Sequence, residues 1–275
     1  MPKEYTLKFS AAVTLQYPYP FTPYGPEAWK EGLDWIAASG LDGAEVCICD
    51  YHGVDVPAFK EELDKRGLGC STISTGQARA REGLSFSGVP ADVIARTQER
   101  YKQHVDAAAI LHSKVTLGLI CGVGSPESRE ADLATLRESL LPLADYAEKK
   151  GVMLILEPLN RYETNILNAT EAAADFIRNR LGNPPSVGVL YDLFHSNIED
   201  ATFDGAIDRL GSLLQHVHIA DSNRQFPGYG HTDFDAIFGK LKAVGFSEYA
   251  SFEHFNLPSR ETVLQKTGRW VASMR

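Results

Sequence analysis

The sequence predicts a single (β/α)8 barrel, the TIM-barrel class of α/β folds, over residues 1–275. Short apolar runs alternate with longer amphipathic segments along the whole chain, which makes eight strand–helix units. Strands that alternate with helices pair in parallel, and barrels of this class use about 250 residues as one domain. The length of 275 residues, without a linker or a low-complexity tract, agrees with one such domain.

The expected strands are short runs rich in apolar residues. Met153–Leu156 is apolar throughout, which is typical of a parallel strand that is buried on both faces. The expected strands are Thr6–Val13, Gly43–Cys49, Leu68–Ile73, Lys114–Ile120, Val152–Leu156, Ser186–Tyr191, Leu213–His218 and Tyr249–Phe252.

The expected helices lie between these strands, and glycine marks the end of several of them. Gly40, Gly67, Gly151 and Gly245 each follow a helical stretch and precede the next strand, at the position where a left-handed cap favours glycine. The expected helices are Pro26–Ser39, Pro57–Arg66, Ala91–Leu111, Ser128–Lys150, Thr170–Leu181, Phe203–Leu210, Asp233–Val244 and Arg260–Met274.

The charge balance argues against nucleic acid and anionic membranes as partners. The chain has 27 basic and 36 acidic residues, a formal net charge of −9, and an acidic surface repels phosphate groups. No apolar run approaches the roughly 18 residues of a membrane span. Met1–Tyr5 carries no long apolar stretch, so we expect no secretory signal and a cytoplasmic location.

The cysteines predict a reduced protein. Four cysteines, Cys47, Cys49, Cys70 and Cys121, are too sparse in 275 residues to form a disulfide framework. Cys47 and Cys49 form a C-x-C pattern in an apolar run, but no second Cys/His pair lies nearby. We therefore expect small buried side chains rather than a soft-metal site.

Four successive expected strands end in a metal-ligand residue. Glu157, Asp192, His218 and Glu253 stand at the carboxyl ends of the fifth to eighth strands. In such barrels the loops after these ends build the active site, so the four side chains converge at the mouth. Three carboxylates and one imidazole suit Mn²⁺, Mg²⁺ or Co²⁺, and Zn²⁺ less selectively. A single acid at a strand end is more often a cap or an ion pair, but four in succession predict a divalent-metal site.

The sequences around these residues resemble the ketose 3-epimerases of the xylose-isomerase-like barrel superfamily. Glu157–Thr164 (EPLNRYET) resembles E-P-L-N-R-[FY]-E-T, and Gly188–Glu199 is similar to G-x-x-x-D-T-F-H-M-N-I-E. His216–Arg224 and Pro227–His231 are similar to H-x-H-x-x-D-x-N-R and P-G-x-G-H. The resemblance includes the D-tagatose 3-epimerase group, and Thr75–Ala78 looks more like the 5-keto-L-gluconate epimerase branch.

The resemblance implies a metal-dependent epimerisation. Glu157, Asp192, His218 and Glu253 would bind the cation, most simply Mn²⁺. Glu157 and Glu253 would also act as acid and base. One carboxylate removes the proton next to the ketone, and the other returns a proton on the opposite face. A cation that holds the carbonyl oxygen and the neighbouring hydroxyl stabilises the enediolate between these steps.

The resemblance also implies three substrate contacts. Glu163, His195 and Arg224 match residues that bind the sugar in these enzymes, although a solvated acid, a helix-start histidine and a loop ion pair are the alternatives. Leu193 departs from the threonine that the family usually has, which removes a hydroxyl beside Asp192. Without this hydroxyl, the Asp192 carboxylate has one fewer neighbouring group that could hydrogen-bond to it, and we expect this to influence which metal the site prefers.

Other functions share the fold and the chemistry. An aldose–ketose isomerase, of sugar or hydroxypyruvate type, uses the same enediolate, and an inosose-dehydratase-like lyase shares the fold and metal. A repair endonuclease would need histidines after the third and fourth strands, where Ser74–Gly76 and Cys121–Val123 have none. A non-catalytic sugar-binding barrel is disfavoured by the intact glutamate pair. We expect a small-molecule sugar as the partner and, from the resemblance, a homo-oligomer (a dimer or a tetramer).

One segment after the first strand stays open. Tyr17–Tyr24 (YPYPFTPY) combines aromatic residues with prolines and lies on the active-site side of the expected barrel. It is equally consistent with a wall or lid over the sugar, with a subunit contact and with a rigid surface loop. Gly122–Ser125 precedes a helix and is expected to be a plain turn rather than an anion site, because no lysine accompanies it.

Overall fold

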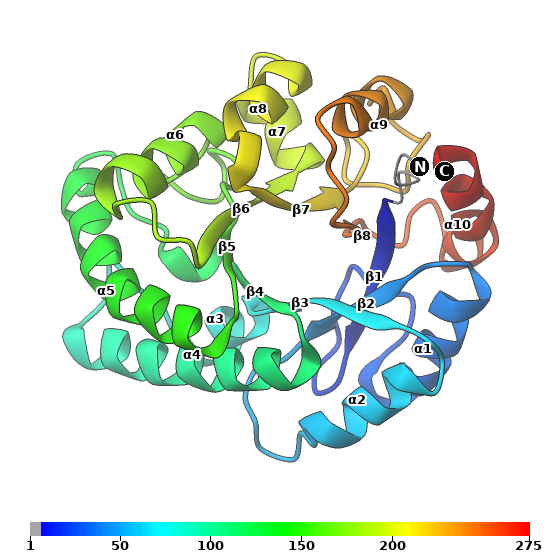
Figure 1. The fold of residues 1–275 in the computed structure, drawn as a ribbon, viewed down its shortest axis with the longest axis horizontal. Helices are drawn as coiled ribbons and strands as arrows, with labels where there is room; N and C mark the ends of the chain where they lie inside the picture. Colours follow the sequence, from blue (N-terminus) through cyan, green and yellow to red (C-terminus); the bar gives the residue numbers. More distant parts are fainter. Residues whose placement is uncertain (1–6) are drawn as a thin grey trace, which may run out of the picture.

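The computed structural model describes residues 7–275 as a closed barrel of eight parallel strands inside a ring of helices (Figure 1). Met1–Tyr5 and the expected start of the first strand at Thr6 lie outside the described residues. The strands are β1 (Lys8–Thr14), β2 (Gly43–Cys47), β3 (Gly69–Ser74), β4 (Lys114–Leu117), β5 (Leu154–Leu156), β6 (Val187–Asp192), β7 (Leu214–Ile219) and β8 (Tyr249–Phe252).

The barrel closes through pairing of its first and last strands. β1 pairs with β8 in parallel, from Lys8 opposite Tyr249 to Ala11 opposite Phe252. Every other strand pairs in parallel with its neighbour in the sequence, so the strand order is that of the chain. All eight carboxyl ends therefore meet at one rim, and the expected (β/α)8 fold is confirmed.

The helices cover the outside of the barrel and bury the outward side chains of the strands. Phe9 of β1, for example, stacks on Phe238 at 5.8 Å between ring centroids and meets the edge of Trp270 at 6.1 Å. The helices are α1 (Trp29–Ala38), α2 (Val56–Asp64), α3 (Gly76–Glu82), α4 (Ala91–Leu111), α5 (Arg129–Lys150), α6 (Thr170–Asp175), α7 (Leu193–Glu199), α8 (Phe203–Leu210), α9 (Phe234–Ala243) and α10 (Arg260–Met274).

Two short helices, α3 and α7, were not expected from the sequence. Each has seven residues, which is too short for a periodic apolar pattern to be recognised. α7 begins directly after β6, and α3 begins one residue after β3. α7 starts where it does because Asp192 Oδ1 accepts the backbone N–H groups of Phe194 and His195. β4 also ends earlier than expected, because the chain turns into a 3₁₀ helix at Leu119–Cys121.

All four cysteines are free and buried. Within residues 7–275 no helix combines the length and the apolar character that crossing a membrane requires. The fifth expected helix, Thr170–Leu181, divides into α6 and a π-helical turn at Phe176–Arg180.

Candidate active site

The four residues at successive strand ends meet at the carboxyl-terminal rim of the barrel. Glu157 follows β5, Asp192 ends β6, His218 lies in β7 and Glu253 follows β8. Each offers one ligand atom, and these four atoms all lie within 4.8 Å of one another. All four side chains are buried. The convergence expected from the strand-end positions is therefore present.

His218 stands at the centre of this group. Its Nδ1 lies 3.1 Å from Glu157 Oε1, 3.2 Å from Glu253 Oε2 and 3.5 Å from Asp192 Oδ2. Asp192 Oδ2 is buried and makes no hydrogen bond, although Arg224 Nη1 lies 3.0 Å away. A buried oxygen without a hydrogen bond, aimed at two other carboxylates and an imidazole nitrogen, fits a divalent cation.

The charges in this group shift one another's pKa values. Burial raises the pKa of Glu157, and the nearby His218 only partly offsets it. Burial also acts against the charged form of Asp192, but Arg224 and His195 outweigh it and hold its pKa well below the usual range. Burial would lower the pKa of His218, but the nearby charges of Glu253 and Glu45 outweigh it and raise the pKa of the imidazole. A positive charge is thus favoured at the centre of the group, where a cation would compete with that proton.

Arg224 is buried against the acidic group rather than exposed on its loop. Its Nη2 contacts Glu253 Oε2, and its guanidinium lies 4.9 Å from the Phe21 ring centroid and 4.8 Å from that of Phe194. The backbone of Arg224 is left-handed, with φ of +61°. Asp221 holds this turn, because its carbonyl oxygen accepts the Arg224 N–H at 2.8 Å. The guanidinium is therefore fixed in place at the rim.

His195 and Glu163 lie on the same side of the site and are joined by a residue that was not singled out. Asn160 Nδ2 lies 2.8 Å from His195 Nδ1 and donates to Glu163 Oε1 at 2.8 Å. Asn160 is buried, whereas Glu163 is exposed. His195 Nε2 lies 3.4 Å from Arg224 Nη1. The three expected substrate contacts thus form one hydrogen-bonded edge of the site.

A cavity of about 340 Å³ opens over the acidic group. Glu157 and Glu253 line it together with the three residues of the polar edge, Glu163, His195 and Arg224. The apolar part of its lining is formed by Tyr19, Phe21, Leu159, Phe194 and Phe255. A larger surface cavity of about 830 Å³ lies by Lys8 and Asp42, at the opposite end of the strands, and shares none of these residues.

The aromatic and proline-rich segment forms one wall of the 340 Å³ cavity. The Tyr19 hydroxyl donates to Glu253 Oε1 at 2.7 Å, and the Phe21 ring lies 5.0 Å from that of Phe255. Asn256 Nδ2 donates to the carbonyl oxygen of Thr22 at 2.9 Å and ties the segment to the loop after β8. Of the three alternatives for Tyr17–Tyr24, these contacts favour the first, in which the segment forms a wall of the active-site cavity.

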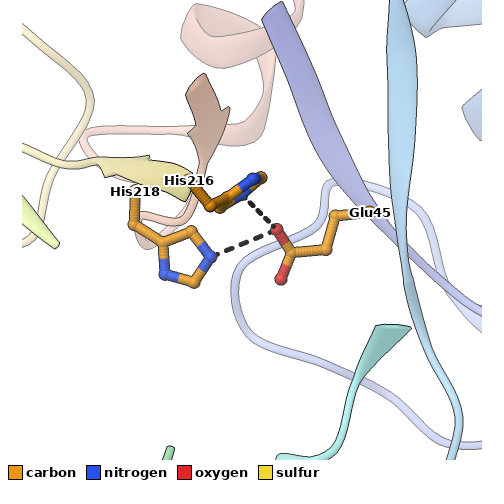
Figure 2. A group of neighbouring side chains, drawn as sticks. All are labelled: Glu45, His216 and His218. Atoms are coloured by element: carbon orange, nitrogen blue, oxygen red, sulfur yellow. Dashed lines mark hydrogen bonds and ion pairs between the residues drawn. The ribbon is translucent and has the colours of Figure 1, made fainter. Parts of the chain in front are cut away.

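Glu45 and His216 lie beneath the rim and were missed in the sequence (Figure 2). Both are fully buried, and Glu45 Oε2 lies 3.1 Å from His218 Nε2 and 3.5 Å from His216 Nε2. Burial would raise the pKa of Glu45, but the two histidines lower it far below its usual range. A lone acid in an apolar strand and two histidines at alternate positions of β7 are the signal that could have found them.

Two small features shape the surroundings of the ligand group. A Cβ atom at Gly118 would lie 2.6 Å from Glu157 Oε2, so a larger residue there would displace this carboxylate from its present position. Leu193, which stands where threonine was expected from the resemblance, packs into the hydrophobic core as the first residue of α7. The support of Asp192 therefore comes from the backbone of α7.

Comparisons with known proteins agree with this fold. The model of the xylose isomerase-like TIM barrel family matches residues 33–274. An L-ribulose 3-epimerase of Methylomonas sp. is 31% identical over 252 residues, which cover 85% of this chain and 84% of that protein. A D-psicose 3-epimerase of Agrobacterium fabrum is 34% identical over 240 residues, with 86% and 79% covered.

A solved structure extends the likeness of the fold to almost the whole chain. A D-psicose 3-epimerase of Clostridium cellulolyticum, solved with D-tagatose, superposes with a TM-score of 0.82 at 20% identity and 98% coverage of both chains. Together with the closed barrel and the strand-end ligand group, these matches show that the chain belongs to the xylose isomerase-like TIM barrel family.

Proposed function

We propose that this protein is a divalent-metal-dependent ketose 3-epimerase that acts on a free ketose or a keto-sugar acid. The observation that carries the proposal is the pair Glu157 and Glu253, which belong to one buried ligand group and also line the cavity. Relatives named as ketose 3-epimerases, at about 30% identity over most of the chain, support the reaction type.

Glu157, Asp192, His218 and Glu253 would hold the cation. Three carboxylates and one imidazole favour Mn²⁺, with Mg²⁺, Co²⁺ or Zn²⁺ as alternatives. When bound, the cation supplies a Lewis acid that stabilises negative charge on the substrate oxygens while the neighbouring proton is away.

The two glutamates would exchange the proton at carbon 3. They follow β5 and β8, which are separated by two strands around the barrel, so they approach the cavity from different sides. One carboxylate removes the proton from one face, and the other returns a proton to the opposite face, which inverts the centre. Burial favours the protonated form of Glu157 by raising its pKa, which suits the role of the acid.

The polar edge and the aromatic wall would bind and orient the sugar. Arg224, His195 and Glu163 present hydrogen-bonding groups along one side of the cavity and are the proposed substrate-binding residues. Tyr19 and Phe21 lie on the other part of the lining and would exclude water from the reacting carbon. The cavity volume of about 340 Å³ suits a small free sugar.

Deuterium exchange tests the proposal. The Mn²⁺-loaded protein is incubated in D₂O with a panel of ketohexoses, ketopentoses and keto-sugar acids, and each is followed by NMR. Deuterium at carbon 3 together with the epimeric sugar supports the proposal. Deuterium at carbon 1 or 2 with aldose formation would point to the aldose–ketose isomerase, and loss of water to the lyase. No exchange across the panel with the metal bound would reject the proposal.

Three further expectations remain predictions. We propose that residues 1–275 form one domain, which the family match over residues 33–274 supports. A homo-oligomer, dimer or tetramer, would be detected by light scattering of the purified protein. A cytoplasmic location would be tested by fractionation of cells that express the chain.

A further inference from the structure

Glu45 is a buried carboxylate that the proposed reaction does not use. It lies in the middle of β2, with no exposed surface, and the ligand group at the rim does not include it. Burying a carboxylate costs several kcal/mol unless hydrogen bonds or opposite charges compensate for it. A carboxylate in the barrel interior is therefore expected to have hydrogen-bonding or positively charged neighbours.

The partners of Glu45 come from a strand on the far side of the interior. His216 and His218 stand at alternate positions of β7, so both side chains lie on the same face of that strand. Figure 2 shows both rings turned toward the Glu45 carboxylate. Its Oε2 lies 3.1 Å from His218 Nε2 and 3.5 Å from His216 Nε2. β8 and β1 separate the two strands around the barrel, so these contacts cross the interior.

The two nitrogens of His218 therefore face two different groups. Nδ1 faces the carboxylates of the rim, with Glu157 Oε1 the nearest at 3.1 Å. A neutral imidazole carries one proton, and a nitrogen that binds a cation must present its lone pair. If Nδ1 is the ligand, the proton must sit on Nε2, where Glu45 Oε2 is placed to accept it.

We infer that Glu45 is a positioning residue for the proposed cation site: its carboxylate accepts the Nε2–H of His218 and so fixes the ring orientation and the tautomer that leave Nδ1 free to bind the cation. The inference rests on the proposed function, because it assumes that His218 is a ligand. Carboxylates behind metal-binding histidines act in this way in many metal sites. His216 supports the arrangement from the other side, as a second ring nitrogen near the same oxygen.

A second cation between Glu45, His216 and His218 is the competing explanation. Their ligand atoms lie close enough to hold one, and Glu45 Oε1 and both nitrogens of His216 are buried without a hydrogen bond. This would require His218 to bind one cation through each nitrogen, which leaves the ring with no proton at all. A hydrogen bond to Glu45 needs no such deprotonation, so the geometry favours the positioning role.

The first test is the affinity of the full chain for Mn²⁺. Metal-free wild type, Glu45→Gln, Asp192→Asn and Thr72→Val are titrated with Mn²⁺, and free Mn²⁺ is followed by electron paramagnetic resonance. We expect Glu45→Gln to weaken binding by roughly 10–100-fold. Thr72→Val removes a different buried hydrogen bond of the barrel, between the hydroxyls of Thr72 and Thr116 at 3.0 Å, and should leave the affinity within about twofold.

The outcomes separate this inference from the proposed function. If Asp192→Asn abolishes binding and Glu45→Gln leaves it unchanged, the cation site stands and the positioning role is overturned. If neither substitution alters Mn²⁺ binding, the proposed site fails and the inference with it. Two Mn²⁺ ions per chain, with one lost in Glu45→Gln, would overturn the positioning role in favour of a second cation.

A second measurement needs no variant and so does not depend on Glu45→Gln folding. NMR of the ¹⁵N-histidine-labelled wild type, loaded with diamagnetic Zn²⁺, reports which ring nitrogen of His218 carries the proton. The inference expects a proton on Nε2, protected from exchange with solvent because the ring is buried. A proton on Nδ1, or none on either nitrogen, would overturn it.

Discussion

The phenol of Tyr19 donates a hydrogen bond of 2.7 Å to Oε1 of Glu253. The other oxygen of this carboxylate, Oε2, lies 3.2 Å from His218 Nδ1 and contacts Arg224. The two oxygens of Glu253 are therefore in different surroundings: Oε2 belongs to the ligand group, and Oε1 faces the aromatic wall of the cavity. In the proposed reaction, Oε1 would then be the oxygen of Glu253 that exchanges the proton.

Removing the Tyr19 hydroxyl should lower kcat more than it changes KM. Tyr19→Phe keeps the ring in the wall but deletes a hydrogen bond to a carboxylate, and such bonds contribute about 1.5–3 kcal/mol. We expect kcat to fall roughly tenfold or more, measured as the rate of epimer formation. Tyr24→Phe is the matched control, because Tyr24 belongs to the same segment but packs on Trp35 outside the cavity. Equal rates in the two variants would contradict a role of the hydroxyl in positioning Glu253.

Replacing either glutamate should separate proton exchange from epimerisation. Glu157→Gln and Glu253→Gln each keep an oxygen ligand but remove one acid–base group, so epimerisation should fall by about 10²–10⁴-fold. In each variant the remaining carboxylate still exchanges the proton of one epimer with D₂O, and the two variants should exchange opposite epimers. The measurement is deuterium incorporation at carbon 3 of each pure epimer.

The control for this pair is the amount of bound metal. Both variants must hold Mn²⁺ at the wild-type stoichiometry under the assay conditions, so that loss of activity is not loss of the cation. Full epimerase activity in Glu253→Gln would be incompatible with the proposed pair.

The sequence was sufficient to predict the barrel and the four converging residues, and the reasons are local. Parallel strands that alternate with helices place all strand ends on one rim, so Glu157 and Asp192 could be grouped without coordinates. The same argument does not reach Glu45, because this residue lies in the middle of β2 rather than at its end and meets His218 across the barrel interior. The position of Tyr19 depends on how an irregular loop folds over the rim, which apolar periodicity does not encode.

Removing the cation should destabilise the fold. Glu157, Asp192 and Glu253 place three carboxylates within 4.8 Å, and a bound cation offsets their repulsion. At a concentration 100 times its Kd, Mn²⁺ would stabilise the protein by about 2.7 kcal/mol, which is roughly 5–10 °C in Tm for a chain of this size. The measurement is thermal unfolding followed by circular dichroism, in EDTA and at increasing Mn²⁺ concentrations.

Asp192→Asn serves as the control for that experiment. It removes one carboxylate charge from the group, so its Tm should respond much less to Mn²⁺ than that of the wild type. An equal response in both proteins would mean that the stabilising cation binds elsewhere.

His104 on α4 is a buried histidine that lies away from the candidate active site. Its Nδ1 lies 2.8 Å from the Tyr51 hydroxyl, its ring is packed against Tyr51 and Tyr101, and it has no exposed surface. Burial, helped by the positive charge of Arg100, lowers the pKa of His104 to about 3. The folded protein therefore keeps this imidazole neutral at a pH where an unfolded chain protonates it.

His104 should therefore make the fold sensitive to mild acid. Between the unfolded pKa of about 6.5 and the folded value of about 3, the unfolded state binds the additional proton, so stability is full above pH 6.5 and falls as the pH is lowered. At pH 5 the loss from this one group is roughly 2 kcal/mol. His104→Gln lacks this titrating group and so does not lose this stability in acid. The difference in unfolding free energy between wild type and His104→Gln should therefore be smaller at pH 5 than at pH 7.5, by that amount. Urea unfolding at both pH values measures this difference, and His52→Gln, at an exposed histidine, is the control. A difference that stays constant between the two pH values would show that the fold does not keep His104 neutral.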